Sequence, residues 1–273
     1  MKNISKKLLA AILIVGSILT GCSVNKANID ESLQPFFDNR GVKGCFTMLN
    51  NADGSITVYN IGMDTMRVSP LSTFEIMGAL VGLQTGAATS EKMVMDLDSL
   101  VCEGNDTCKN MNMAEAFQSG CGAYFQQLAQ ITGKERLQYW IDSIGYGNKK
   151  LTDPIDSSWM NGTLAISPDE QLGLMKRLYF DQLPFRKTVQ ETVRQLMLQE
   201  DNSAYRLSYK TGHGVDARQQ PISWICGWIE ENKHVYFFVT LLQTDKPGKM
   251  EQDMASLISR DILGHYGFFK GKK

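Results

Sequence analysis

The chain has 273 residues, enough for one large domain with a substantial core. Its 28 basic and 29 acidic side chains give a formal net charge of −1. This balance argues against nucleic-acid binding, because that function needs a basic surface. No internal repeat, low-complexity tract or long Pro/Gly linker divides the sequence. We therefore expect a single folded domain over residues 22–273, preceded by a targeting segment.

That segment, residues 1–21, is predicted to be a lipoprotein signal peptide. Three lysines precede an apolar run over residues 8–19, which is too short for a permanent membrane span. The Leu-Thr-Gly-Cys that ends at Cys22 is similar to a bacterial lipobox, which implies cleavage before Cys22 and acyl chains that anchor the protein to a membrane. The protein would then be exported and face the periplasm. The alternative is a plain signal peptide, with Cys22 incidental and the protein free.

Hydrophobic periodicity and turn residues predict a group of helices between two groups of strands. Strands are expected over residues 43–50, 55–60, 204–211, 222–230 and 235–242. Helices are expected over residues 29–37, 73–84, 113–118, 120–132, 134–143, 168–179, 185–199 and 250–263. This order indicates an α+β fold with one central antiparallel sheet, helices on its faces, and an inserted all-helical lobe over about residues 85–200. Ligands commonly bind between two such parts.

Ser72 is the candidate nucleophile because it stands at the start of a predicted helix. Ser69 and Pro70 end an extended segment, and apolar residues then recur at helical spacing from Ile76. The first turn of a helix offers unpaired N–H groups and the positive end of the helix dipole, which favour a developing negative charge. Most serines in this position are only N-caps. The case for Ser72 therefore depends on the motifs further along the chain.

Four motifs come after it in order: Ser119-Gly120-Cys121, Tyr146-Gly147-Asn148, Trp159 ahead of Ile166-Ser167-Pro168, and Tyr209-Lys210-Thr211-Gly212. With Ser-Pro-Leu-Ser-Thr-Phe at residues 69–74, they resemble the class D (oxacillinase-type) serine β-lactamases over roughly residues 29–269. The resemblance implies a β-lactamase/transpeptidase-like fold and a hydrolase of β-lactams or peptidoglycan-like small molecules. Neither a cofactor nor a metal is expected, since no Cys/His spacing fits a zinc site.

The resemblance also assigns roles to individual residues. Ser72 would attack the lactam carbonyl, with its own N–H and the backbone of His213 as oxyanion donors. Ser119 would relay a proton to the leaving nitrogen while Lys210 sets the local charge. The substrate would be held by Lys210 and Thr211, and the site would be flanked by Gly212, Tyr146, Asn148 and Trp159.

Each of these residues also has an ordinary structural interpretation. Ser119 fits an N-cap of the following helix, and Lys210 fits a solvated strand residue. The residues Tyr146 to Asn148 fit a tight turn, and the His213 side chain is expected to be incidental. Only the ordered combination with Ser72 favours catalysis.

Glu75 is the sharpest departure from the family, which has a lysine three residues after the nucleophile. That lysine carries a carbon dioxide-derived carbamate that acts as the base, held by the tryptophan that Trp159 matches. Glutamate keeps the carboxylate but is shorter by roughly 3–4 Å. Ser72 and Glu75 still share a helix face, and apolar walls would raise the pKa of Glu75 while Lys210 would lower it. Three outcomes stay open: slow hydrolysis, acylation without release as in a penicillin sensor, or an inactive pseudoenzyme.

A second departure concerns the arginine that in the family pairs with the drug carboxylate near the start of the last helix. This chain offers only Lys246 and Lys249 there, neither of which matches an arginine fork, and Arg218 is a candidate substitute.

The remaining cysteines are interpreted for an oxidising compartment. Cys102 and Cys108 flank a polar loop and form a candidate small disulfide, although a short loop gains little from closure. Cys45 and Cys226 lie in apolar strands and are expected to be buried thiols. Cys121 stands where the family tends to have valine, and is expected to be apolar. The oligomeric state is not predicted.

Overall fold

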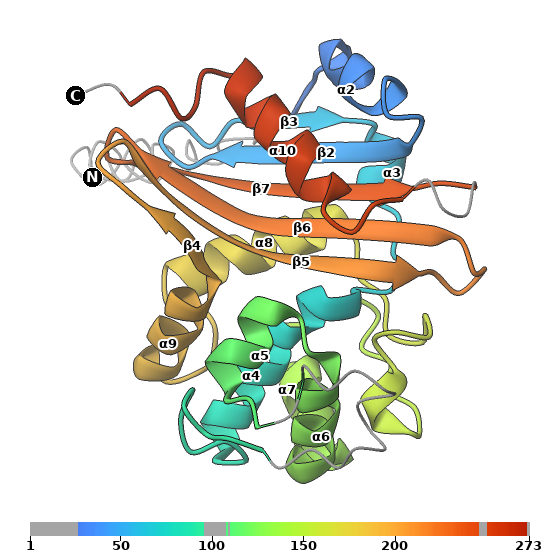
Figure 1. The fold of residues 1–273 in the computed structure, drawn as a ribbon, viewed down its shortest axis with the longest axis vertical. Coiled ribbons are helices and arrows are strands. Elements are labelled where there is room, and N and C mark those ends of the chain that lie inside the picture. The colour runs from blue at the N-terminus through green and yellow to red at the C-terminus, as the bar shows by residue number, and fades with distance from the viewer. Residues whose placement is uncertain (1–26, 96–107, 109, 246–249, 272–273) are drawn as a thin grey trace, which may run out of the picture.

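A computed structural model describes residues 27–95, 108, 110–245 and 250–271 of the chain (Figure 1). The predicted signal peptide with Cys22, and the residues Cys102, Lys246 and Lys249, lie outside these ranges. Among the described residues, no helix combines the length and apolarity needed to cross a membrane.

One sheet of seven strands forms the centre of the molecule, in the order β1-β3-β2-β7-β6-β5-β4. The strands are β1 (Ala27–Ile29), β2 (Lys43–Asn50), β3 (Ile56–Tyr59), β4 (Leu198–Asp201), β5 (Tyr205–Val215), β6 (Pro221–Glu231) and β7 (His234–Gln243). All five predicted strands are present. The sheet is nevertheless mixed and not purely antiparallel, because β1 pairs in parallel with β3.

The prediction of a helix over residues 29–37 was wrong at its start, where β1 ends at Ile29. All three residues of β1 are exposed, and three residues are too few for a hydrophobic pattern to mark this edge strand. The segment continues with a 3₁₀ turn, η1 (Glu31–Leu33), and a shorter helix, α2 (Gln34–Asp38). Similarly, the predicted helix over residues 185–199 ends earlier, at Met197, and its last residues form the edge strand β4.

The helices cover the sheet on two faces (Figure 1). One face carries α2 and the last helix, α10 (Met254–His265). The other carries α8 (Pro168–Tyr179), which begins as predicted and is capped by Ser167 and Glu170. Next to α8 lies the rest of the helical lobe, which comprises α4 (Glu75–Thr85), α5 (Met113–Ser119), α6 (Gly122–Thr132), α7 (Lys134–Ile144) and α9 (Lys187–Met197). The remaining short elements are α3 (Ile61–Asp64), η2 (Leu71–Phe74) and η4 (Ile155–Ser157).

Strand β6 shows how the sequence fills both faces. Ile225 and Ile229 belong to the apolar core beneath α10, whereas Trp224, Cys226 and Trp228 belong to the core that includes the helical lobe. Successive side chains of a strand point to opposite faces. A continuous apolar run therefore marks a strand that is buried on both sides and lies in the middle of the sheet.

Asp64 is an acidic residue that is buried in the interior. Asp64, at the end of α3, is 4% exposed, and its Oδ1 has no hydrogen-bond partner among the described residues. Burial, together with the nearby Asp169 carboxylate, raises the pKa of Asp64 to about 7. The native state then holds a proton between about pH 4 and pH 7 that the unfolded state has lost. Stability should therefore fall as the pH rises through this range.

We expect the substitution Asp64→Asn to remove this pH dependence. At pH 8 the variant should exceed the wild type in unfolding free energy by up to about 4 kcal/mol, and the two should converge near pH 4. Urea unfolding at pH 5 and pH 8 measures the difference. Glu135→Gln, at an exposed acid of α7, is the matched control and should show no such trend. An equal offset of Asp64→Asn at both pH values would contradict the prediction.

Candidate active site

Ser72 lies in the turn η2, which leads directly into α4. The turn is fixed by backbone contacts: the Leu71 N–H donates to the Trp159 carbonyl at 3.0 Å, and Trp224 Nε1 donates to the Ser69 carbonyl at 2.9 Å. Leu71 has a φ of 51°, a left-handed conformation that costs energy in a leucine and is common at functional sites. Ser72 is partly exposed while its neighbours in the turn are buried. Its hydroxyl is therefore the polar side-chain group that this turn offers to a ligand.

Glu75, three residues after Ser72 and the first residue of α4, forms a buried ion pair with Lys210 of β5. Glu75 Oε2 and Lys210 Nζ are 2.6 Å apart, and the side chains are only 2% and 6% exposed. Lys210 Nζ also donates to the Phe117 carbonyl at 2.6 Å and lies 4.5 Å from the centre of the Phe117 ring. The predicted alternative of a solvated strand lysine was therefore wrong. The ammonium is held by α4 and α5 together.

The environment of Glu75 makes it a candidate base. Burial raises the pKa of the Glu75 carboxyl, although the Lys210 ammonium and the Ser72 hydroxyl both act to lower that pKa. The Ser72 hydroxyl thus lies close enough to influence the carboxylate. A carboxylate whose pKa is raised accepts a proton more readily than an ordinary one. Ser72, Glu75 and Lys210 form a connected set of groups that can move a proton.

Strand β5 brings its backbone against the N-terminal side of Ser72. A Cβ atom added to Gly212 would lie 3.1 Å from the Pro70 carbonyl oxygen and 3.2 Å from the backbone nitrogens of Ser72 and Thr73. A side chain at this position would fit only if the strand or the turn moved by a few tenths of an ångström. The neighbouring His213 has an exposed side chain. The backbone at residues 212–213 is therefore next to the Ser72 N–H, where two oxyanion donors would have to meet.

The outer edge of β5 borders a cavity of about 390 Å³. Strand β4 pairs with β5 only as far as Ser208, so the edge beyond that residue has no strand partner among the described residues. The cavity is lined by Phe117, Gln118, Gln199, Tyr209, Lys210, Thr211, Gln252, Asp253 and Ser256. Thr211, one of the predicted substrate contacts, faces a space that a small molecule can enter. Arg218 lines a different cavity, with Arg67 and Asp216.

The two predicted aromatic residues brace the turn that carries Ser72. The Trp159 ring stacks on Phe74 with centroids 4.6 Å apart, and Tyr146 meets the same ring edge-on at 5.6 Å. Both Trp159 and Tyr146 are buried. They hold the position of η2, and any contact with a substrate remains a prediction.

Asn148 uses its side chain within the protein. Its Oδ1 accepts from the Ala165 N–H at 3.1 Å, and its Nδ2 donates to the Thr163 carbonyl at 2.8 Å. At the preceding Gly147, φ is 49°, and an added Cβ would lie 2.1 Å from the Ala165 oxygen. These contacts support the tight-turn interpretation, and the assignment of Asn148 to the substrate stays a prediction.

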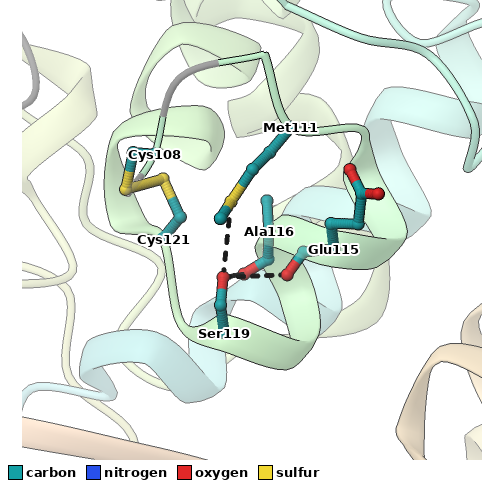
Figure 2. The surroundings of a disulfide bond; sticks show 6 residues. All are labelled: Cys108, Met111, Glu115, Ala116, Ser119 and Cys121. Carbon is teal, nitrogen blue, oxygen red and sulfur yellow. Dashed lines mark hydrogen bonds between the residues drawn. A yellow bond between two sulfur atoms is a disulfide. The ribbon is translucent and has the colours of Figure 1, made fainter. Parts of the chain in front are cut away.

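Ser119 is the last residue of α5, so its interpretation as an N-cap of the next helix was wrong: the N-cap of α6 is Cys121. The Ser119 hydroxyl donates to the Glu115 carbonyl at 2.8 Å and lies 3.5 Å from Met111 Sδ (Figure 2). The contact between α5 and Lys210 is made by Phe117, two residues before Ser119. The hydroxyl of Ser119 bonds within its own helix and to Met111, and its role as a proton relay to Lys210 remains a prediction.

The predicted pairing of Cys108 with Cys102 was wrong. Cys108 forms a disulfide with Cys121, with their Cα atoms 5.8 Å apart (Figure 2). Cys121 is thus half of a cystine and not merely an apolar substitute for valine. Spacing along the chain favoured Cys102 as the partner of Cys108. In the folded chain, Cys108 lies next to Cys121, which is in the turn between α5 and α6. Cys45 and Cys226 are buried free thiols, as predicted.

Two residues at the site were not predicted. Phe117 positions Lys210 through its carbonyl and ring, and Leu71 adopts the strained conformation next to the nucleophile. An apolar residue in a helix gives no sequence signal for such a role. The described ranges hold no group of three or more His, Cys, Asp or Glu side chains placed to bind a metal ion.

The model of the penicillin binding protein transpeptidase domain matches residues 39–264 of this chain. The chain belongs to this family. It is 30% identical to β-lactamase OXA-5 of Pseudomonas aeruginosa, over 97% of this chain and 99% of that protein. Its structure is similar to that of FUS-1 (OXA-85), a class D β-lactamase from Fusobacterium nucleatum subsp. polymorphum, with 28% identity, a TM-score of 0.83, and coverage of 89% of this chain and 100% of that chain.

A regulatory protein of the family is similar to the same degree. The C-terminal domain of the Bacillus licheniformis BlaR penicillin-receptor has 28% identity, a TM-score of 0.83, and coverage of 90% of this chain and 98% of that domain. The chain spans 46% of the length of the regulatory protein BlaR1 of that organism. The predicted resemblance and the α+β fold are thereby confirmed. Within the transpeptidase family, the chain is of the class D β-lactamase-like serine hydrolase type.

Gly212→Ala tests the close approach of β5 in this family member. The added methyl should displace the strand or the turn by a few tenths of an ångström and weaken the oxyanion donors. We expect acylation by a fluorescent penicillin to slow by up to about 10²–10³-fold, with little change in Tm. Gly173→Ala is the matched control, because a Cβ at this helical position meets nothing within 4 Å. Equal acylation rates in the two variants would contradict the prediction.

Proposed function

We propose that this chain opens β-lactam rings through an acyl-enzyme on Ser72, with Glu75 as the base. The observation that supports this most strongly is the buried ion pair of Glu75 with Lys210, which lies beside the partly exposed Ser72 hydroxyl. A family of serine acyl-enzymes needs a nucleophile, a proton acceptor and a fixed positive charge near each other. This arrangement supplies all three, although the acceptor is a glutamate where the class D proteins carry a modified lysine.

In the proposed acylation, Ser72 Oγ attacks the lactam carbonyl carbon and its proton passes to Glu75. The carbonyl oxygen becomes negative and is stabilised by N–H groups at the start of α4 and on β5. The C–N bond of the ring then breaks. Its electron pair stays on the nitrogen, which takes up the proton that Glu75 received from Ser72, relayed through Lys210 and Ser119, so that Glu75 is again a carboxylate. Ser72 is left as an ester of the opened ring, and Lys210 keeps the local charge balanced.

Hydrolysis of that ester requires a water molecule that gives its proton to Glu75 and attacks the ester carbon. The bond to Ser72 Oγ then breaks, and Ser72 Oγ takes the proton that Glu75 received from the water. Glu75 is 2% exposed and already contacts Lys210. Water therefore has to reach a carboxylate that is shielded from solvent and paired with an ammonium. This step is therefore the one that we expect to limit turnover.

A second candidate function is that of a β-lactam sensor, which is acylated without release. The closed Glu75 pair supports it, as does the similarity to the domain of the BlaR penicillin-receptor. A time course of intact mass with a penicillin, recorded together with ring opening, separates the candidates. A transient adduct with ring opening identifies a hydrolase, and a lasting adduct identifies a sensor. Absence of both at high drug concentration contradicts both, and leaves a pseudoenzyme.

Glu75→Lys provides a further test of the last outcome. If the wild type is inactive and this variant hydrolyses penicillin, the remainder of the site is intact and Glu75 alone accounts for the loss. If the variant is also inactive, the site has lost its function for another reason.

We also propose that the protein is exported and anchored to a membrane by lipid on Cys22, so that it faces the periplasm. The basic, apolar and lipobox-like segments of residues 1–22 support this proposal. Fractionation of cells that express the full chain tests it. The wild type should be recovered with membranes and Cys22→Ser should not. Recovery of both in the same fraction would contradict a lipid anchor.

A further inference from the structure

The disulfide between Cys108 and Cys121 closes a loop that contains the whole of α5. One residue inside this loop contacts the site, and a second is a predicted part of it. Phe117 holds Lys210 through its carbonyl oxygen, at 2.6 Å, and through its ring. Ser119, the predicted proton relay, is two residues further on. The covalent link therefore encloses the segment that positions the charged partner of Glu75.

The turn after α5 is attached to the disulfide on one side and to the helix on the other. The Cys121 N–H donates to the Ala116 carbonyl at 2.9 Å, and Gly120 between them has a φ of 74°. The Cys121 side chain is 4% exposed and is joined to Cys108. A displacement of Cys121 would thus pull on the last turn of α5, where Phe117 contacts Lys210.

The segment that the disulfide holds in place also contacts the exposed Ser119. Figure 2 shows the Met111 side chain between the disulfide and α5, with its sulfur 3.5 Å from the Ser119 hydroxyl. Met111 is only three residues from Cys108. The disulfide fixes this short stretch over the end of the helix, and so limits where the Ser119 hydroxyl can turn.

We propose that Cys108 and Cys121 are positioning residues of the site, and that the oxidised form is the one competent for acylation. This inference rests on the proposed function. In the oxidised protein, the loop closed by Cys108 and Cys121 keeps Lys210 Nζ next to Glu75 Oε2. It also keeps the Ser119 hydroxyl in contact with Met111. A dithiol reductant would transfer two electrons and two protons to the disulfide, which leaves two thiols on the protein and a disulfide in the reductant. Cys108 is partly exposed and can be reached by such a reagent.

The first measurement needs no β-lactam. The Lys210 side chain is only 6% exposed in the oxidised protein, so its amine is shielded from reagents in solution. We expect its labelling by an amine-reactive acetylating reagent, followed by peptide mass spectrometry, to rise severalfold after reduction with dithiothreitol. The exposed Lys149 and Lys187 are internal references and should label equally in both states. A disulfide that served only global stability would leave Lys210 shielded in folded protein.

The second measurement is the acylation rate with a fluorescent penicillin, on the same samples and at a temperature where circular dichroism shows both forms folded. We expect reduction to slow acylation by about 10²-fold, the cost of a displacement of roughly 1 Å. The double variant Cys108→Ala/Cys121→Ala should match the reduced wild type and should not respond to the reductant. Cys102→Ala is the matched control and should keep the response of the wild type. The buried thiols Cys45 and Cys226 are present in every sample.

Unchanged labelling of Lys210 and unchanged acylation, in protein whose Cys108 and Cys121 are shown to be reduced by alkylation, would overturn the inference. If Lys210 becomes accessible on reduction but neither form gives a penicillin adduct, the positioning role stands and the proposed function fails. The two failures are therefore distinguishable.

Discussion

Ser72→Ala is expected to abolish the covalent adduct with a penicillin and to reduce any ring opening to background. The hydroxyl is the atom that would become acylated, and loss of the nucleophile from a serine hydrolase costs about 10⁶-fold in kcat. Because Ser72 is partly exposed, the substitution removes one oxygen without opening a cavity in the core. Intact-mass spectrometry after long incubation at high drug concentration measures the result.

The control for this experiment is Ser143→Ala, at an exposed serine on α7 whose hydroxyl donates to the Tyr139 carbonyl. It should form the adduct as the wild type does. Both variants should unfold within a few degrees of the wild type, since each change removes one hydroxyl from a residue that is not buried. An adduct that persists on Ser72→Ala would mean that another group, such as the motif serine Ser119, is the nucleophile.

The strands that sequence reasoning found are those with strong patterns. Strand β6 is apolar on both faces, and β7 beside it is as well, so their runs of aromatic and β-branched residues are evident. Strands β1 and β4 were missed because they are short edge strands with exposed residues. Their existence depends on hydrogen bonds to neighbours that are distant in the chain. No local pattern carries that information.

For the site, the sequence predicted the groups but not how they are held. The order of motifs identified Ser72, Glu75 and Lys210, and the charge type of Glu75 indicated a base. The sequence did not indicate that Glu75 contacts Lys210 directly, or that Phe117 holds the Lys210 ammonium. The disulfide of Cys121 was missed for the same reason. Each of these depends on the packing of α5 against β5 and α4, which only the folded chain defines.

Glu75→Gln should lower acylation by about 10²–10⁴-fold, the usual cost of losing a general base. The substitution keeps the shape of the side chain and removes its charge, so the fold of η2 should persist. In the wild type, acylation should rise with pH as Glu75 loses its proton, with a midpoint above the ordinary glutamate pKa because burial raises that pKa. The variant should lack this rise. Stopped-flow acylation between pH 4 and pH 8 measures both effects.

The same substitution leaves Lys210 buried without its anionic partner, which should lower the unfolding free energy by about 3–5 kcal/mol. This loss has to be separated from the loss of the base. The double variant Glu75→Gln/Lys210→Met removes both charges, and should recover most of the stability because an uncharged pair needs no compensation. It should not recover acylation. If it did, Glu75 would act only as a counter-ion for Lys210, and the proton of Ser72 would have to leave by another route.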